Sequence, residues 1–69
     1  MNVLIEMTAL NLNRPAPNAT SEVVAAWFEA KALLHEHIAA EGGSDAGQQS
    51  AWAMAAHERA RTVTLGRAA

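Results

Sequence analysis

Alanine occupies 17 of the 69 positions, and this bias sets the kind of fold that the chain can adopt. Alanine has the highest helix propensity because it loses no side-chain rotamer freedom in a helix. It also buries little area per position, so a core built on alanine gains less than a leucine core even when the helices approach closely. The composition therefore predicts strong local helicity together with a weak core in a single copy.

Neither a disulfide nor a thiolate metal site can stabilise that core. The chain has no cysteine, which excludes disulfides, a thiolate metal site and thiol redox chemistry. A chain of this length forms one domain, here 1–69, and such small folds depend on disulfides, a metal, good helix packing or oligomerisation. Helix packing and self-association remain, so the sequence favours an assembly of copies.

The N-terminal part of the chain differs from the rest. Along residues 2–13 apolar side chains recur with a period of two, which is typical of a strand or an extended arm. A short helix through Leu4–Leu10 is the alternative. Residues 14–19 contain Pro15 and Pro17, which disfavour helix in the residues before them, so we expect an extended linker there.

Two helices follow the linker. Thr20 or Ser21 is suited to cap the first helix, which we expect over about 21–40 because nothing inside that range breaks a helix. Gly42 and Gly43 end it, with Gly42 suited to the left-handed C-terminal position.

The second helix is expected over about 46–63. Asp45 followed by Gln48 resembles a capping box at its start, and β-branched residues followed by Gly66 mark its end. The predicted fold is mainly α. It is an antiparallel helical hairpin within 20–66, carrying the N-terminal extended segment and dimerising into a four-helix arrangement.

The first helix has an unusually wide apolar arc. Its acidic residues Glu22, Glu29 and Glu36 recur every seven positions and predict a narrow solvated ridge on the opposite side. One partner helix covers an arc of roughly 100°, so this helix needs at least two neighbours. Its main apolar stripe consists of Val23, Trp27, Ala30, Leu34 and Ile38.

The second helix offers Trp52 and several alanines on one stripe. We expect Trp27 and Trp52 to be large core residues that pack into the spaces left by the small alanines. Phe28 lies off the centre of the stripe and is a candidate binding-surface residue. The predicted protein-interface residues are Trp27, Phe28, Leu34, Ile38 and Trp52.

The histidines are the only candidates for site chemistry. His35 and His37 are two residues apart and point about 200° away from each other on a helix, so they cannot chelate one ion. A site that joins His57 to one of them across the hairpin or across a dimer axis is the alternative, and surface or interface histidines are the favoured interpretation. The serines are better explained as capping or early-helix residues than as nucleophiles. We therefore expect no metal, no cofactor and no enzymatic activity.

One alternative function involves nucleic acid. A strand followed by two helices in a small dimer resembles, in element order only, the ribbon-helix-helix repressors, which implies a DNA-binding regulator or an antitoxin-like protein. Against it, Leu4 and Glu6 would face the DNA from the strand, and both are poorly suited to phosphates and base edges. The net charge of -2 also gives no basic stripe.

The leading interpretation is a small protein–protein interaction module, such as a regulatory, adaptor or assembly factor, whose partners are a second copy and another protein. No stretch approaches the roughly 18 apolar residues of a membrane span, and no signal peptide precedes the apolar run, so we expect a cytoplasmic protein. The alanine- and arginine-rich composition is typical of a high-GC bacterial or phage genome.

Overall fold

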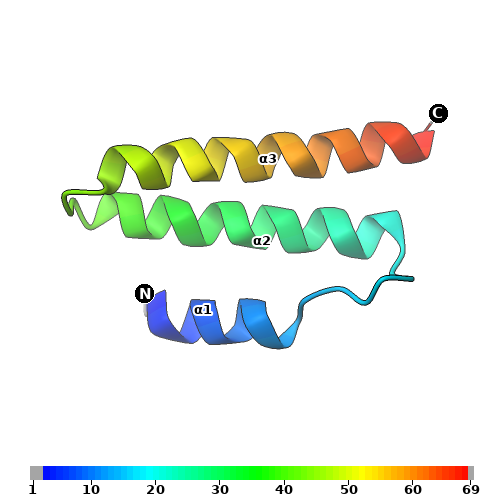
Figure 1. The fold of residues 1–69 in the computed structure, drawn as a ribbon, viewed down its shortest axis with the longest axis horizontal. Coiled ribbons are helices and arrows are strands. Elements are labelled where there is room, and N and C mark those ends of the chain that lie inside the picture. Colours follow the sequence, from blue (N-terminus) through cyan, green and yellow to red (C-terminus); the bar gives the residue numbers. More distant parts are fainter. Residues whose placement is uncertain (1–2, 69) are drawn as a thin grey trace.

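The computed structural model describes residues 3–68, which form three α-helices and the segments between them (Figure 1). Helix α1 spans Val3–Leu12, α2 spans Ser21–Ala40 and α3 spans Ala46–Ala68. The described residues contain no strand, so the expectation of a mainly α fold is confirmed.

The predicted strand or extended segment at 2–13 is wrong, because its described residues form α1. A lone strand leaves its backbone groups without partners, whereas a helix satisfies them within itself. Two polar side chains of this segment donate hydrogen bonds to carbonyls one helical turn earlier. The Thr8 hydroxyl donates to the carbonyl of Leu4 (3.0 Å), and the Asn13 side-chain amide donates to the carbonyl of Ala9 (2.8 Å).

Helix α2 begins and ends at specific local signals. Thr20 has extended backbone angles, and its hydroxyl accepts a hydrogen bond from the backbone N–H of Val23 at 3.2 Å, which caps the helix. At the other end Gly42 has a φ of 77°, in the left-handed region. A Cβ atom there would meet nothing within 4 Å, so the backbone angle is what favours glycine.

Helix α3 runs five residues beyond its predicted end at 63, and Gly66 lies inside it. The β-branched residues at 62–64 therefore do not end the helix. The hydroxyls of Thr62 and Thr64 donate to the carbonyls of Glu58 and Ala60, at 2.9 and 3.0 Å, so both threonines are accommodated in helical backbone.

The three helices lie side by side in the view of Figure 1, with α2 in the middle, and form an open layer in which α1 and α3 each pack on α2. Helix α3 lies antiparallel to α2 along one edge, and the shorter α1 lies along the other edge. Within the described residues no Cα atom of α1 lies within 8 Å of one in α3. The molecule measures 39 × 22 × 16 Å, so it is elongated along the helix axes.

The buried core is small and lies mainly between α2 and α3. Ala32 is completely inaccessible to solvent, and no larger side chain of the described residues reaches full burial. Alanine lets two helix backbones approach closely, but it removes little apolar area from water. The buried apolar residues are Ala32, Leu34, Ala53, Ala56 and Ala60.

Candidate protein-interaction surfaces

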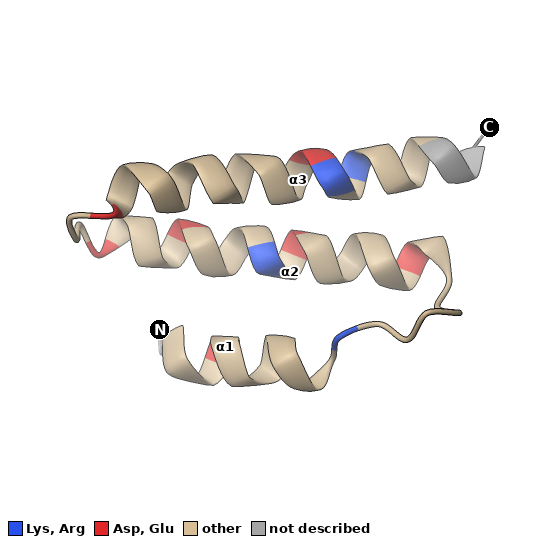
Figure 2. Cartoon of the chain, in the orientation of Figure 1, with Lys and Arg blue, Asp and Glu red and all other residues tan. Residues whose placement is uncertain are grey.

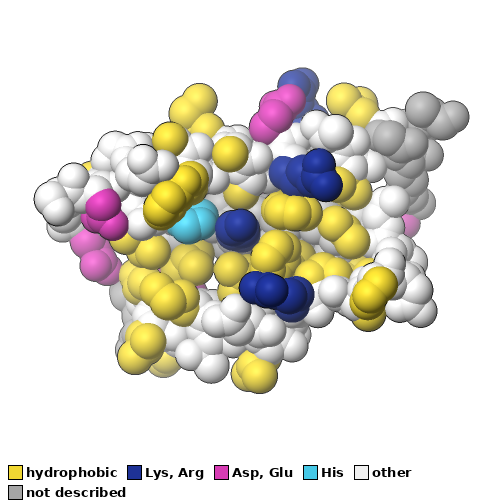
Figure 3. Space-filling model, viewed as in Figure 1, with side chains coloured by type: hydrophobic (Ala, Val, Ile, Leu, Met, Phe, Trp, Pro, Cys, Tyr) yellow, Lys and Arg dark blue, Asp and Glu magenta, His cyan; other side chains and the backbone are white. Residues whose placement is uncertain are grey.

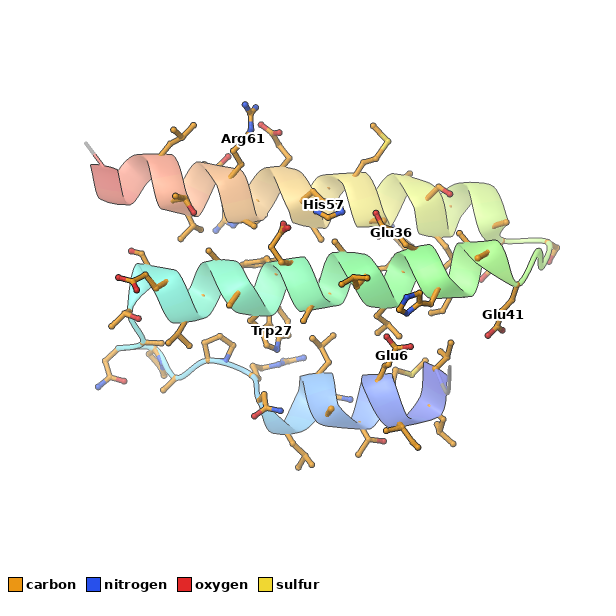
Figure 4. The ribbon with its side chains drawn as sticks, turned by 180° about the vertical axis from the view of Figure 1, so that it is seen from behind. Glu6, Trp27, Glu36, Glu41, His57 and Arg61 are labelled. Carbon is orange, nitrogen blue, oxygen red and sulfur yellow. The ribbon has the colours of Figure 1, made fainter. Side chains whose placement is uncertain are left out.

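The predicted interface residues divide between the two edges and one face of the layer. Trp27 is half-buried and points toward α1 (Figure 4). Helical spacing puts Leu34 and Ile38 on the same stripe of α2; Leu34 is buried and Ile38 is half-buried. Much of this stripe is therefore already covered within one chain.

Two polar contacts attach α1 to α2. The indole N–H of Trp27 donates to the carbonyl of Leu10 at 2.9 Å, and this carbonyl belongs to the last turn of α1, where helical partners are lacking. Nearer the start of α1, Nδ1 of His37 lies 2.7 Å from Oε1 of Glu6. The second oxygen of Glu6 is buried without a hydrogen-bond partner in the described residues, so this attachment is incompletely satisfied.

A hollow of about 400 Å³ opens between α2 and α3 on the face shown in Figure 3, and we call it the front groove. Its residues are Phe28, Lys31, His35, Trp52, Ala55, Ala56 and Arg59.

Aromatic rings and cations alternate in and beside the front groove. The rings of Phe28 and Trp27 meet edge to face, with centroids 5.2 Å apart, and those of His35 and Trp52 lie 5.5 Å apart. The Arg59 guanidinium lies 5.8 Å from the centre of the Phe28 ring. Trp52 is 46% exposed, so it is a groove residue and not the core anchor that the sequence predicts.

The opposite face, seen in Figure 4, holds a cluster of carboxylates around a histidine. Nδ1 of His57 lies 3.0 Å from Glu29 Oε1, and Nε2 lies 2.9 Å from Glu36 Oε2. A carboxylate only accepts hydrogen bonds, so two such contacts favour the imidazolium form. Accordingly, the hydrogen bonds with Glu36 and then Glu29 raise the pKa of His57 above its usual 6.5.

These contacts correct the prediction of a purely solvated glutamate ridge. Two of its three members, Glu29 and Glu36, join α2 to α3 through His57. Helical spacing correctly puts these glutamates on the side of α2 opposite the Trp27 stripe. That side lies beside α3, and helical spacing alone does not indicate which neighbour a side of a helix meets.

His35 also connects α2 to α3. Its Nδ1 lies 2.6 Å from Oε1 of Gln49, a buried polar residue, and Gln49 in turn donates to the Asp45 carboxylate at 3.1 Å. The Asp45 carboxylate therefore accepts a hydrogen bond from the Gln49 side chain. The sequence instead predicts a capping box between Asp45 and Gln48. All three histidines, His35, His37 and His57, thus contact a side chain of a neighbouring helix. In the described part of the chain, no group of three or more metal-ligating residues could hold an ion.

The side of α1 that faces away from α2 is apolar and open to solvent. We call it the outer face of α1, and a shallow hollow of about 420 Å³ lies on it, lined by Leu4, Ile5, Thr8, Ala9 and Leu12. Leu4, Ile5 and Leu12 are 70%, 66% and 80% exposed. This face carries no charged side chain, because Glu6, the acidic residue of α1, is turned toward His37.

None of the described helices combines the length and the apolar character needed to cross a lipid bilayer. Comparisons of the chain with protein-family models, with curated proteins and with solved structures give no match.

Proposed function

We propose that this chain is a protein–protein interaction module that assembles with a second copy of itself through the outer face of α1. In this role it serves as a regulatory, adaptor or assembly factor and has no catalytic function. One observation carries the proposal: large apolar side chains occupy both the side of α1 that packs on α2 and the side that faces water.

The exposed leucines and isoleucine of α1 favour association energetically. A surface helix of a monomer presents polar residues to water, whereas a helix that is apolar all round belongs in a buried position. Burying a leucine or isoleucine side chain stabilises by roughly 1.5–3 kcal/mol. Leu4, Ile5 and Leu12 therefore provide a substantial driving force for covering this face.

A second copy is the favoured partner because two copies of the outer face of α1 can pack on each other without charge repulsion. An isologous dimer places the same patch on both sides of the interface, so a patch with charges of a single sign would repel its copy. The outer face of α1 has no charge to repel its copy. Two such helices packed side by side also allow close contact around the small Thr8 and Ala9.

Sedimentation equilibrium over a range of protein concentrations tests the proposal. We expect the wild-type chain to shift from monomer mass toward dimer mass, and the double variant Leu4→Glu/Leu12→Glu to remain monomeric. Asn18→Glu, which adds a negative charge in the exposed linker, is the control that should dimerise normally. Circular dichroism verifies equal helix content. A wild-type chain that stays monomeric at every concentration contradicts the proposal.

The DNA-binding alternative depended on an N-terminal strand. Ribbon-helix-helix proteins read bases with paired strands, and the described N-terminal residues form a helix. We do not propose this function.

A further inference from the structure

We propose that the front groove binds an acidic segment of a partner protein that inserts a large apolar side chain. The inference rests on the proposed interaction role, but it uses a surface that is separate from the outer face of α1. It depends on two properties of the groove: uncompensated positive charge, and an apolar hollow with aromatic walls.

The positive charge on this face is not neutralised by any described side chain. Lys31 and Arg59 line the groove, and Arg14 lies beside it, with its guanidinium 5.8 Å from the Trp27 ring. Lys31 approaches the same ring at 5.8 Å. Among the described residues, none of these three cations has a carboxylate within the 4.0 Å of an ion pair.

Charged side chains lie on all three helices and in the linker (Figure 2), and several of those outside this face form pairs. Arg61 lies 2.8 Å from Glu58, and His57 on the back face contacts Glu29 and Glu36. Although the net charge is -2, the face in Figure 3 carries dark blue side chains between hydrophobic ones. A cluster of one sign attracts ligands of the opposite sign and orients them, so this face favours an acidic partner.

The shape of the groove adds an apolar requirement. Its aromatic residues are Phe28 and Trp52, and the methyl groups of Ala55 and Ala56 provide small apolar contacts. A hollow of about 400 Å³ accommodates a side chain such as leucine, phenylalanine or tryptophan. Binding grooves commonly combine such an apolar pocket with a few charged groups at the margin, as here with Lys31 and Arg59.

A protein segment fits these features better than a nucleic acid does. Nucleic-acid affinity comes mainly from many phosphate contacts, and this face offers three cations on a chain that is negative overall. Single strands are also bound by a row of stacking platforms along a basic track, whereas the front groove is one local hollow.

The test uses fluorescence anisotropy with labelled peptides and the full-length chain. The main probe is a short peptide with glutamates on both sides of a Leu-Phe pair. A second peptide has lysines in place of the glutamates, and a third has alanines in place of Leu-Phe. We expect the first peptide to bind at least about tenfold more tightly than either of the others.

Charge reversal locates the binding. Lys31→Glu and Arg59→Glu should each weaken binding of the first peptide about tenfold or more, because they place like charge against it. Arg61→Glu makes the same charge change on the outer side of α3 and should leave the dissociation constant within about twofold. Circular dichroism of every variant checks that the helices are intact.

Three outcomes would overturn the inference: equal binding of the acidic and lysine peptides, unchanged binding in Arg59→Glu, or preference for a single-stranded oligonucleotide over the acidic peptide. The Leu4→Glu/Leu12→Glu variant separates this question from dimerisation, since its front groove is intact and it should bind the first peptide like the wild type. Loss of peptide binding with normal dimerisation refutes only the groove. Normal peptide binding by a strictly monomeric wild type refutes only the dimer.

Discussion

At the scale of single residues, the charge state of His57 affects the contact between α2 and α3. Both ring nitrogens contact carboxylate oxygens of α2, so the contact is complete only when the ring carries two protons. The hydrogen bonds with Glu36 and Glu29 accordingly raise the pKa of His57. One protonation event therefore affects the junction between α2 and α3.

The sign of the pH dependence follows from the raised pKa. The stabilisation by His57 is fully present below the unfolded-state pKa near 6.5 and is lost as the pH rises through the higher folded-state pKa. We expect nuclear magnetic resonance titration to give a midpoint for His57 above 6.5. Glu36→Gln, which removes the largest cause, should lower that midpoint. A midpoint at or below 6.5 in the wild type would show that the carboxylates do not hold the ring.

At the scale of helices, the sequence predicted those elements whose ends have strong local signals. Thr20 and Gly42 define α2 through a side-chain cap and a positive φ, both of which act over a few residues. Helix α1 was predicted as a strand because apolar residues on all sides give period two and helical spacing equally well. The alternative of a short helix through Leu4–Leu10 was closer to what the structure shows.

The candidate site was harder to predict, because it depends on which elements become neighbours. The sequence correctly grouped Trp27, Leu34 and Ile38 on one stripe, but it did not assign α1 as the cover of that stripe. It also gave no sign that Phe28 and Trp52, which are 24 positions apart, line the same groove. Helix periodicity determines which side chains share a face of one helix, but it does not determine which helix packs against that face.

The contact between α2 and α3 depends on alanine at its closest points. Ala32 is fully inaccessible, so a larger side chain there must push the helices apart or take a strained rotamer. We expect Ala32→Leu to lower the free energy of unfolding by about 1–3 kcal/mol, the usual range for overpacking. Urea unfolding followed by circular dichroism measures it. Ala51→Leu, at an exposed position of α3, is the matched control and should change stability by less than about 0.5 kcal/mol.

At the scale of the whole molecule, a single layer of helices exposes more surface than a compact chain of the same mass. The chain has 4800 Å² of accessible surface, whereas a folded monomer of 7.3 kDa is expected to have about 4200 Å². The radius of gyration is 12.7 Å, against about 11 Å expected for this length. Stable domains usually pack two layers around one core, and here a partner can supply what the single layer lacks.

Thermal unfolding at several protein concentrations tests whether the excess surface is covered by association. If folded copies bind one another, mass action stabilises the folded state, and the melting temperature rises with concentration. For a chain of this size, about 1 kcal/mol corresponds to roughly 4–8 °C, so a tenfold increase should raise the melting temperature of the wild type by a few degrees. Leu4→Glu/Leu12→Glu should melt at a constant temperature, because its outer face can no longer pair. If the wild type also melts at a constant temperature, the open layer is stable alone, and its exposed apolar area has to be explained by a different partner.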